Sequence, residues 1–346
     1  MPEPFRVSPL PHDAANLAAA LALHDAAHAL EVAWLDGYRL PRLWRTVDDI
    51  VSSPLQILAA WDEAGTLCGL LTLGRYKDGR ADIARTLVHP QRLGEGWAGR
   101  LLTVALQHEQ AATVMTAAAN RAAVRCYQKA GFVESKRFAA PDGLPLLRLA
   151  WTRDDSPLPL SLGDDGWVNE AQHLPSPNCD DYPAPAATPL LVVHNISLPP
   201  YRYGGSGVAE LFTNTLDPAA HPFYAEIAHL RVSCHFFIRR DGSLVQFVPV
   251  HRRAWHAGAS QWQGRERCND FSLGVELEGC DFEPFAHAQY RTLAALAQLL
   301  QAQCGVQAIT GHEHIAPGRK TDPGPYFDWA RLSATLGRPL PENGAG

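Results

Sequence analysis

A stretch rich in proline, aspartate and serine near the middle of the chain constrains the fold more than any other feature. Residues 151–189, WTRDDSPLPLSLGDDGWVNEAQHLPSPNCDDYPAPAATP, keep neither the helical nor the strand period of apolar residues. Segments that do keep one of these periods lie on both sides of it. Because 346 residues are more than a single core usually takes, the sequence predicts two domains joined by a linker.

The first half of the chain mixes predicted strands and helices. Residues 55–76, LQILAAWDEAGTLCGLLTLGRY, predict a strand, a turn at residues 63–65 and a second strand. The sequence then predicts a strand in 81–90, a helix in 96–111, a strand in 113–119 and a helix in 121–131 that Gly131 closes.

The second half has the same mixed character. PLLVVHNIS (189–197) predicts a buried strand, residues 233–249 predict a hairpin that turns at Asp241 and Gly242, and residues 271–279 predict a further strand. HAQYRTLAALAQLLQAQ (287–303) is the clearest amphipathic helix. We therefore predict an α/β (α+β) two-domain fold, with a mixed sheet and helices in each domain.

Composition excludes several classes of partner and of structure. The formal net charge of −6 provides no basic surface for nucleic acid or an anionic membrane. The apolar segment of residues 16–30 is interrupted by His24, Asp25 and His28 and lacks a basic leader, so we expect a helix there and no export signal. The seven cysteines are scattered and form no C-x-x-C pair, which favours reduced thiols and a cytoplasmic location.

A loop between a predicted strand and a predicted helix is the first candidate site. LVHPQRLGEGWAGRLL (87–102) places Gly94 and Gly96 where backbone N–H groups and the helix dipole attract a phosphate. Two glycines alone favour an ordinary turn. The segment that follows, NRAAVRCYQKAGFVE (120–134), changes this balance, since Asn120 and Gly131 stand at the expected start and end of a helix.

Together the two segments resemble the GNAT family of acetyl-CoA-dependent N-acetyltransferases, over roughly residues 5–150. The resemblance implies that acetyl-CoA is the cofactor and that Tyr127 is the general acid. It also implies a pyrophosphate loop, Q-x-x-G-x-G, formed by Gln91, Arg92, Leu93, Gly94, Glu95 and Gly96. The acceptor amine remains open, as does the alternative that the domain binds CoA without turnover.

The segment GHEHIAPGRKTDPGP (311–325) is the second candidate site. His312 and His314 are only two positions apart, so they do not form the H-E-x-x-H pair of a zinc protease helix. A single histidine could instead share a metal with Asp322 and with distant residues. His194 ends a predicted strand, and Glu276 lies in another strand that could lie beside it.

Four segments in the second half closely resemble AmpD-type amidases, over roughly residues 164–335. They are residues 190–200, 221–249, 253–279 and 311–329. These relatives are cytosolic zinc N-acetylmuramoyl-L-alanine amidases that act on 1,6-anhydromuropeptides. The resemblance implies zinc ligands at His194, His312 and Asp322, a catalytic Glu276, and Lys320 as the residue that stabilises the oxyanion. It implies that His314 is not a ligand.

The same resemblance implies which residues contact the muropeptide. Arg231 and Arg267 correspond to positions near the peptide stem, where guanidinium groups suit carboxylates. The expected groove is lined by Asn195, Trp255, His256 and Ala257. Phe223 departs from the pattern, since relatives commonly have Tyr there; the hydroxyl is missing or is supplied by Tyr224.

The predicted organisation is a GNAT-like domain over 1–152, a linker over 153–163, a zinc amidase domain over 164–335 and a flexible tail over 336–346. A zinc amidase is the leading interpretation. The alternatives are a muropeptide-binding sensor without catalysis and a chain whose principal activity is acetyl transfer. The oligomeric state remains open.

Overall fold

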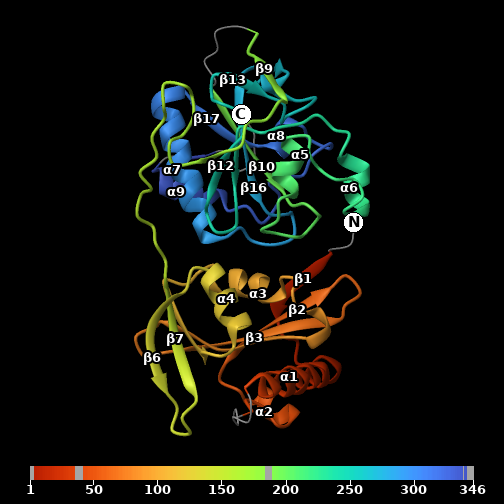
Figure 1. Ribbon diagram of the computed structural model, residues 1–346, viewed down its shortest axis with the longest axis vertical. Coiled ribbons are helices and arrows are strands. Elements are labelled where there is room, and N and C mark those ends of the chain that lie inside the picture. The colour runs from red at the N-terminus through yellow and green to blue at the C-terminus, as the bar shows by residue number, and fades with distance from the viewer. Residues whose placement is uncertain (1–3, 36–41, 184–188, 338, 341–346) are drawn as a thin grey trace. The chain divides into compact units, whose positions relative to one another are not determined.

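The computed structural model describes residues 4–35, 42–183, 189–337 and 339–340. The chain divides into two compact units, Met1–Asp154 and Asp155–Gly346. Each unit contains its own sheet and its own helices (Figure 1). The predicted mixed α/β fold with two domains is therefore confirmed.

Unit 1 is built on a seven-stranded sheet in the order β1-β2-β3-β4-β5-β7-β6. Its strands are β1 (Phe5–Pro9), β2 (Gln56–Asp62), β3 (Leu67–Arg75), β4 (Ala81–Val88), β5 (Ala111–Ala117), β6 (Val133–Ala139) and β7 (Pro145–Thr152). Its helices are α1 (Ala14–Trp34), α2 (Val47–Val51), α3 (Trp97–Leu106) and α4 (Arg121–Lys129), with a short η1 (Pro90–Arg92). The strands and helices predicted for this half are present, but α3 ends at Leu106 instead of residue 111, and β5 begins at Ala111.

Helices cover both faces of the unit 1 sheet (Figure 1). Alternate residues of β3 point to opposite faces: Leu70 belongs to the apolar cluster that includes Leu17 and Leu23 of α1, whereas Gly69 faces Leu101 of α3. The parallel strands β4 and β5 are paired only between residues 81–83 and 112–114. Beyond these pairs the two strands are not joined, at the end of β4 that leads into the Gly94 loop.

Unit 2 is built on a six-stranded sheet in the order β17-β10-β16-β11-β12-β8. These strands are β8 (Gln172–His173), β10 (Leu190–Ile196), β11 (Phe236–Ile238), β12 (Leu244–Gln246), β16 (Ser272–Glu278) and β17 (Ala308–Gly311). Small strand pairs join β9 (Cys179–Asp181) to β13 (Arg252–Ala254) and β14 (Gln261–Trp262) to β15 (Arg265–Glu266). The helices are α5 (Gly207–Phe212), α6 (Pro222–Ile227), α7 (His287–Cys304), α8 (His312–Ile315) and α9 (Trp329–Leu336), with η2 (Cys268–Asp270).

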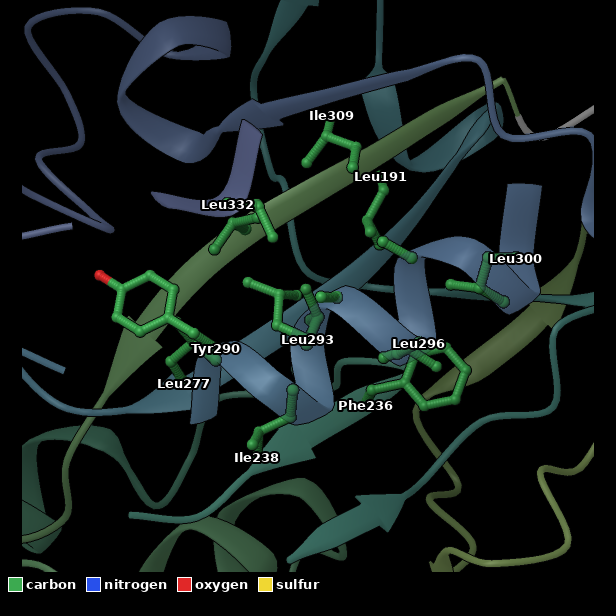
Figure 2. Packing of buried hydrophobic residues seen from close by; sticks show 14 of the residues in the cluster. Leu191, Phe236, Ile238, Leu277, Tyr290, Leu293, Leu296, Leu300, Ile309 and Leu332 are labelled. Carbon is green, nitrogen blue, oxygen red and sulfur yellow. The ribbon is translucent and has the colours of Figure 1, made fainter. Parts of the chain in front are cut away.

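The long helix α7 packs against one face of this sheet (Figure 2). Leu293, Leu296 and Leu300 of α7 join Leu191 of β10 and Leu277 of β16 in one buried cluster. Truncation of such a leucine to alanine typically costs about 2–5 kcal/mol. This core fixes β10 and β16 side by side and leaves their opposite face to carry the candidate site.

The segment predicted as a linker, 153–163, contacts unit 2 from residue 155 onward. His287 Nε2 lies 3.0 Å from the carboxylate of Asp155, and Arg291 Nε donates to the carbonyl oxygen of Ser156 at 2.7 Å. Leu160 packs against the α7 core. We therefore place the boundary between the units after Asp154.

The predicted tail, 336–346, falls partly outside the described residues. Within the described part, Leu336 ends α9 and Leu340 is buried against the α7 core. All seven cysteines are free thiols, as the sequence analysis expects. No helix in the described ranges combines the length and apolar character needed to span a bilayer.

Candidate functional site

The sheet of unit 2 brings together two residues that are distant in the sequence. β10 and β16 are neighbouring parallel strands, and His194 lies opposite Glu276 in their register. On β10, Leu191 and Val193 face the α7 core, so His194 lies with Val192 on the other face. The expectation that these two strands are neighbours is confirmed.

Three potential metal-ligand atoms converge near the carboxyl end of β10. The Nδ1 atoms of His194 and His312 are 2.9 Å apart, and each lies 3.0 Å from Oδ2 of Asp322. His312 is the first residue of α8, directly after β17. Both imidazoles are buried, while the Asp322 side chain remains 15% exposed. Solvent therefore reaches the cluster from the aspartate side.

A backbone carbonyl sets which nitrogen of His312 faces this cluster. Nε2 of His312 lies 3.1 Å from the carbonyl oxygen of Ala257. Since a carbonyl can only accept, the imidazole donates from Nε2 and keeps the lone pair on Nδ1. That lone pair is directed at His194 and Asp322. Burial lowers the pKa of His194 to about 4, so this imidazole is neutral near pH 7.

The cluster has the donor set of a divalent metal site. Imidazole and carboxylate lone pairs at such short distances repel one another unless a positive charge lies between them. Zinc takes histidine nitrogen and aspartate oxygen ligands, and catalytic zinc sites combine three protein ligands with an open fourth position. In the part of the chain that the structure describes, His194, His312 and Asp322 are the one group of three or more His, Cys, Asp or Glu residues whose potential ligand atoms lie this close together.

Glu276 contributes a buried carboxylate beside these ligands. It is 9% exposed, and its Oε2 atom has no hydrogen-bond partner among the described residues. Burial and then the charge of Asp322 raise the pKa of Glu276 well above its ordinary value, while the Lys320 ammonium acts in the opposite direction. A carboxyl group with a raised pKa is suited to proton transfer near neutral pH.

Glu278, two positions further along β16, is held by the backbone. Its Oε1 accepts the N–H of Gly204 at 2.6 Å, and its Oε2 accepts the N–H of Arg240 at 3.0 Å. Both carboxylate oxygens are therefore occupied by loops that pack on the sheet. Of the two glutamates on this face, Glu276 is the one with an oxygen available for chemistry.

Lys320 and Arg319 lie in the loop between α8 and Asp322. Lys320 is exposed, and its effect on the pKa of Glu276 puts its charge within electrostatic reach of the site. Arg319, which the sequence analysis did not assign, donates from Nη2 to the carbonyl oxygens of Ala257 and Ala259, at 2.8 and 2.6 Å. It thereby supports the carbonyl that orients His312.

His314 is not part of the ligand cluster. Its Nδ1 accepts the backbone N–H of Gly311 at 3.1 Å, and its ring packs against Trp329 with the centroids 5.7 Å apart. Burial lowers the pKa of His314, which keeps the imidazole neutral in this position. The contacts of His314 are those of a structural side chain.

Asn195 and Trp255, predicted to line the substrate groove, bond to neighbouring segments. The Asn195 amide donates to the carboxylate of Asp281 at 2.7 Å and to the carbonyl oxygen of Pro323 at 3.0 Å. This ties the end of β10 to the residue after Asp322. The Trp255 indole N–H donates to Asp180 at 3.2 Å.

His256 and Ala257, also predicted to line the groove, lie directly behind the two imidazoles of the cluster. Nδ1 of His256 is 2.9 Å from Nε2 of His194, and the Ala257 carbonyl accepts from His312. Oδ1 of Asn269 accepts the backbone N–H groups of both residues, at 3.1 and 2.8 Å. The sequence analysis did not assign Asn269, although it lies within residues 253–279, which resemble AmpD-type amidases.

The two arginines predicted to bind the peptide stem are exposed. Nη1 of Arg231 lies 3.2–3.4 Å from the carbonyl oxygens of residues 228–230. Arg267 has a left-handed backbone, with φ 63°, and its 71% exposed side chain pairs with Asp270 at 3.1 Å. Both guanidinium groups therefore remain accessible to a dissolved anion.

Tyr224 is a core residue of unit 2. It is 7% exposed, and its hydroxyl packs against Gly207, where an added Cβ would collide with it. Phe223 is partly buried against the same apolar cluster. The Tyr224 hydroxyl is thus enclosed, which argues against its replacing the hydroxyl that is missing at Phe223.

In unit 1, a loop with two left-handed glycines leads into α3. Gly94 has φ 81° and Gly96 has φ 90°, a region that residues with a Cβ rarely adopt. Gly96 is the N-cap of α3 and offers no side chain to cap it. A Cβ at Gly94 would meet nothing within 4 Å, so the outer side of the loop is open. Backbone N–H groups at such a helix start attract phosphate.

The side chains of this loop do not provide a free positive charge for a phosphate. Arg92 binds Asp62 at 2.7 Å through Nη1 and Glu95 at 2.8 Å through Nε. Gln91 and Leu93 are exposed. The loop thus presents backbone donors, while its one arginine is neutralised by two carboxylates.

Tyr127 is buried on α4, 5% exposed, with its ring 5.7 Å from that of Phe132. Burial raises the pKa of its phenol above the ordinary value, so the hydroxyl stays protonated at neutral pH. Asn120 caps α4 by accepting the N–H of Ala123 at 3.1 Å, and its amide donates to Glu31 at 3.3 Å. Glu31 is a polar neighbour that the sequence analysis did not identify.

Comparison with known families agrees with this division of the chain. The N-acetylmuramoyl-L-alanine amidase family model matches residues 186–325. The acetyltransferase (GNAT) family model matches residues 23–132. The first range contains the metal-ligand cluster and Glu276, and the second contains the Gly94 loop and Tyr127.

Individual relatives match the C-terminal half. The 1,6-anhydro-N-acetylmuramyl-L-alanine amidase AmpD of Salmonella typhimurium is 59% identical over 177 residues, which are 51% of this chain and 95% of the relative. AmpD of Escherichia coli is 56% identical over 180 residues, 51% of this chain and 98% of the relative. A crystal structure of a selenomethionine AmpD derivative matches with a TM-score of 0.50 and 56% identity, over 51% of this chain and 99% of that one. The chain therefore belongs to the N-acetylmuramoyl-L-alanine amidase family, with an acetyltransferase (GNAT) family domain in its N-terminal part.

Proposed function

We propose that unit 2 is a zinc hydrolase that cleaves the amide between 1,6-anhydro-N-acetylmuramic acid and L-alanine in muropeptides, during cell-wall recycling. The observation that carries the proposal is the convergence of His194, His312 and Asp322 beside Glu276, whose Oε2 is buried without a partner. Relatives that share 56–59% of their residues with this half are named for that reaction.

His194, His312 and Asp322 would hold the zinc ion. When bound, zinc lowers the pKa of a coordinated water toward about 7 and polarises a carbonyl group. Proton transfer and stabilisation of the oxyanion are carried out by side chains of the protein. The buried imidazoles also exclude bulk water from the reacting groups.

Glu276 is the proposed general base and acid. Its available carboxylate oxygen lies on the ligand face of the sheet, where it can take a proton from the attacking water and pass it to the departing amine of L-alanine. Lys320 is the proposed partner of the oxyanion that develops on the scissile carbonyl. The Lys320 ammonium lowers the pKa of Glu276, and a charge directed at an oxyanion typically lowers a barrier by about 2.7–4 kcal/mol.

The peptide stem supplies carboxylates that arginine can bind. Arg231 and Arg267 are exposed, and guanidinium groups pair with carboxylates through two hydrogen bonds. We propose these two arginines for recognition of the stem, together with Trp255. The seven free thiols support the expectation that the protein works in the cytoplasm.

Hydrolysis of a defined muropeptide tests this proposal. The zinc-loaded protein is incubated with anhydro-N-acetylmuramoyl tripeptide, and mass spectrometry follows release of the free sugar acid and the tripeptide. We expect cleavage that a chelator stops and added zinc restores. Binding of the intact muropeptide without cleavage by the zinc-loaded protein would make it a sensor instead.

A second candidate function, acetyl transfer from acetyl-CoA to an amine, is favoured for unit 1 by a specific observation. The Gly94 loop opens toward solvent, and β4 and β5 do not pair with each other beyond residues 83 and 114. The backbone groups on the facing edges of the two strands are thus left for an extended ligand. Tyr127 would then donate a proton to the departing thiolate. Incubation with acetyl-CoA and a panel of amines, read by mass spectrometry, tests it; calorimetry that shows no binding of acetyl-CoA would reduce unit 1 to a scaffold.

A further inference from the structure

A chain of hydrogen bonds runs from His194 into the interior of unit 2. Nε2 of His194 lies 2.9 Å from Nδ1 of His256, and Nε2 of His256 lies 3.2 Å from the hydroxyl of Ser272. That hydroxyl donates to the carbonyl oxygen of Cys268 at 2.6 Å. The chain thus ends on a group that can only accept.

Because the Cys268 carbonyl can only accept, it determines which atom is the donor in every hydrogen bond of this chain. The single hydroxyl proton of Ser272 is used on Cys268, so the Ser272 oxygen must accept from Nε2–H of His256. A neutral His256 then has its lone pair on Nδ1 and accepts from Nε2–H of His194. His194 is left with its lone pair on Nδ1, the atom that lies 2.9 Å from Nδ1 of His312.

We propose that His256 and Ser272 are positioning residues that hold His194 in the tautomer able to bind the metal. The proposal rests on the zinc site of the proposed function and adds to it two residues that act on the metal through His194. For His312 the Ala257 carbonyl has the same effect in one step. Both imidazoles therefore present Nδ1 before any ion binds.

The backbone beneath His256 is shaped for this ring. A Cβ added to Gly274 of β16 would lie 2.6 Å from Cγ and 2.7 Å from Nδ1 of His256, and 2.8 Å from Sγ of Cys234. Gly274 has no positive φ, so its conformation alone would accept a side chain. The absence of a side chain at Gly274 is thus explained by the ring that lies over it and by the neighbouring thiol.

The first test measures zinc affinity by competition with a chelating dye. His256→Leu removes the acceptor for His194, and we expect zinc affinity to fall about 10- to 100-fold, the usual loss when the partner of a metal-binding histidine is removed. His256→Asn can place an amide oxygen where Nδ1 stood and should recover part of the loss. His173→Leu removes a histidine-to-carbonyl hydrogen bond at Val168 on the edge strand β8, which β16, β11 and β12 separate from β10; it is the matched control and should bind zinc normally.

The second test reads the tautomer directly. Nitrogen NMR of the metal-free, histidine-labelled full chain should show the proton of His194 on Nε2, and a mixture of tautomers after His256→Leu. The His194 signal is assigned by its loss in His194→Gln. A proton on Nδ1 in the unaltered protein, or normal zinc affinity in folded His256→Leu, would overturn the proposal. If the unaltered protein bound no zinc, the proposed function would fail, while the tautomer would still decide this inference.

Gly274→Ala provides an independent variant. It should lower zinc affinity in the unaltered background but have less effect once His256→Ala has removed the ring, because the two residues act through one contact. Full additivity of the two losses would show that Gly274 does not act through His256.

Discussion

The metal-ligand cluster of unit 2 is made of side chains that other groups hold in place, whereas the glycine loop of unit 1 offers backbone donors. His194 and His312 each have a partner behind the ring, His256 and the Ala257 carbonyl. In the loop, the Arg92 side chain is bound to two carboxylates and the left-handed Gly96 opens the helix start. The two sites therefore rely on different parts of the polypeptide.

This difference decides which substitutions each site tolerates. A site built from side chains fails when a side chain is removed or turned, since each ligand supplies one donor. A site built from backbone N–H groups tolerates most side-chain substitutions. It fails when an added side chain blocks the approach of the ligand. The predictions below test this contrast, from the largest expected effect to the smallest.

Removal of any metal ligand should abolish both zinc binding and hydrolysis. His194→Ala, His312→Ala and Asp322→Ala each leave two of three ligands, which do not retain the ion. Metal analysis of the purified protein and the muropeptide assay measure the two losses. His314→Ala is the matched control, since that ring contacts Gly311 and Trp329 instead. Retention of zinc by His312→Ala and its loss in His314→Ala would reverse the assignment.

Loss of the general base should separate catalysis from metal binding. Glu276→Ala should keep one zinc ion per chain and lower turnover by about 100-fold or more, because proton transfer to and from the reacting groups is lost. The same two assays measure it. Glu278→Ala should instead destabilise the fold, since two backbone N–H groups lose their acceptor. Near-normal turnover of Glu276→Ala would mean that another group is the base.

Addition of a side chain at Gly96 should damage the loop of unit 1, whereas addition of one at Gly99 should not. Gly96→Trp should weaken acetyl-CoA binding by about 10-fold or more, because it forces a left-handed residue and fills the approach to the helix start. Calorimetry measures the affinity, and muropeptide hydrolysis should not change. Gly99→Ala within α3, where a Cβ meets nothing within 4 Å, is the control. Equal binding by Gly96→Trp would place the cofactor elsewhere.

Separation of the two units should have the smallest effect. Each unit has its own buried core, and the AmpD relatives are almost fully covered by a match to half of this chain. Residues 155–346 alone should hydrolyse muropeptide within about twofold of the full chain, and residues 1–154 alone should bind acetyl-CoA. The cut follows Asp154 because Asp155 and Ser156 bond to α7. An inactive C-terminal fragment would show that the zinc site depends on unit 1.

The sequence predicted the elements well and the neighbours of the site less well. Periodicity located β10, β16 and α7, because an apolar period follows directly from one buried face. The contacts of His256 could not be predicted in this way. Its partners His194 and Ser272 lie 62 and 16 residues away, and only the folded register brings them together.

The boundary region shows a second limit of sequence reasoning. Residues 155–163 have the composition of a linker, yet Leu160 packs on the α7 core and Asp155 bonds to His287. Composition indicates whether a segment would be flexible in isolation. It does not indicate whether the segment packs against a neighbouring surface, as residues 155–163 do against unit 2. The Gly94 loop was easier to locate, because a backbone position with a positive φ is usually occupied by glycine, which can be read from the sequence.

The bare backbone at Gly274 also restricts the order in which this protein can change over generations. A side chain at this position collides with the His256 ring and the Cys234 thiol, so it becomes acceptable only after the ring has been exchanged for something smaller and the thiol has moved or been replaced. That exchange removes the proposed partner of His194. In a descendant with a larger residue at position 274, substitution back to histidine at position 256 would cause a steric clash. The histidine could then return only after glycine had been restored at position 274. Gly274 is therefore expected to remain glycine for as long as the His256 ring lies over it.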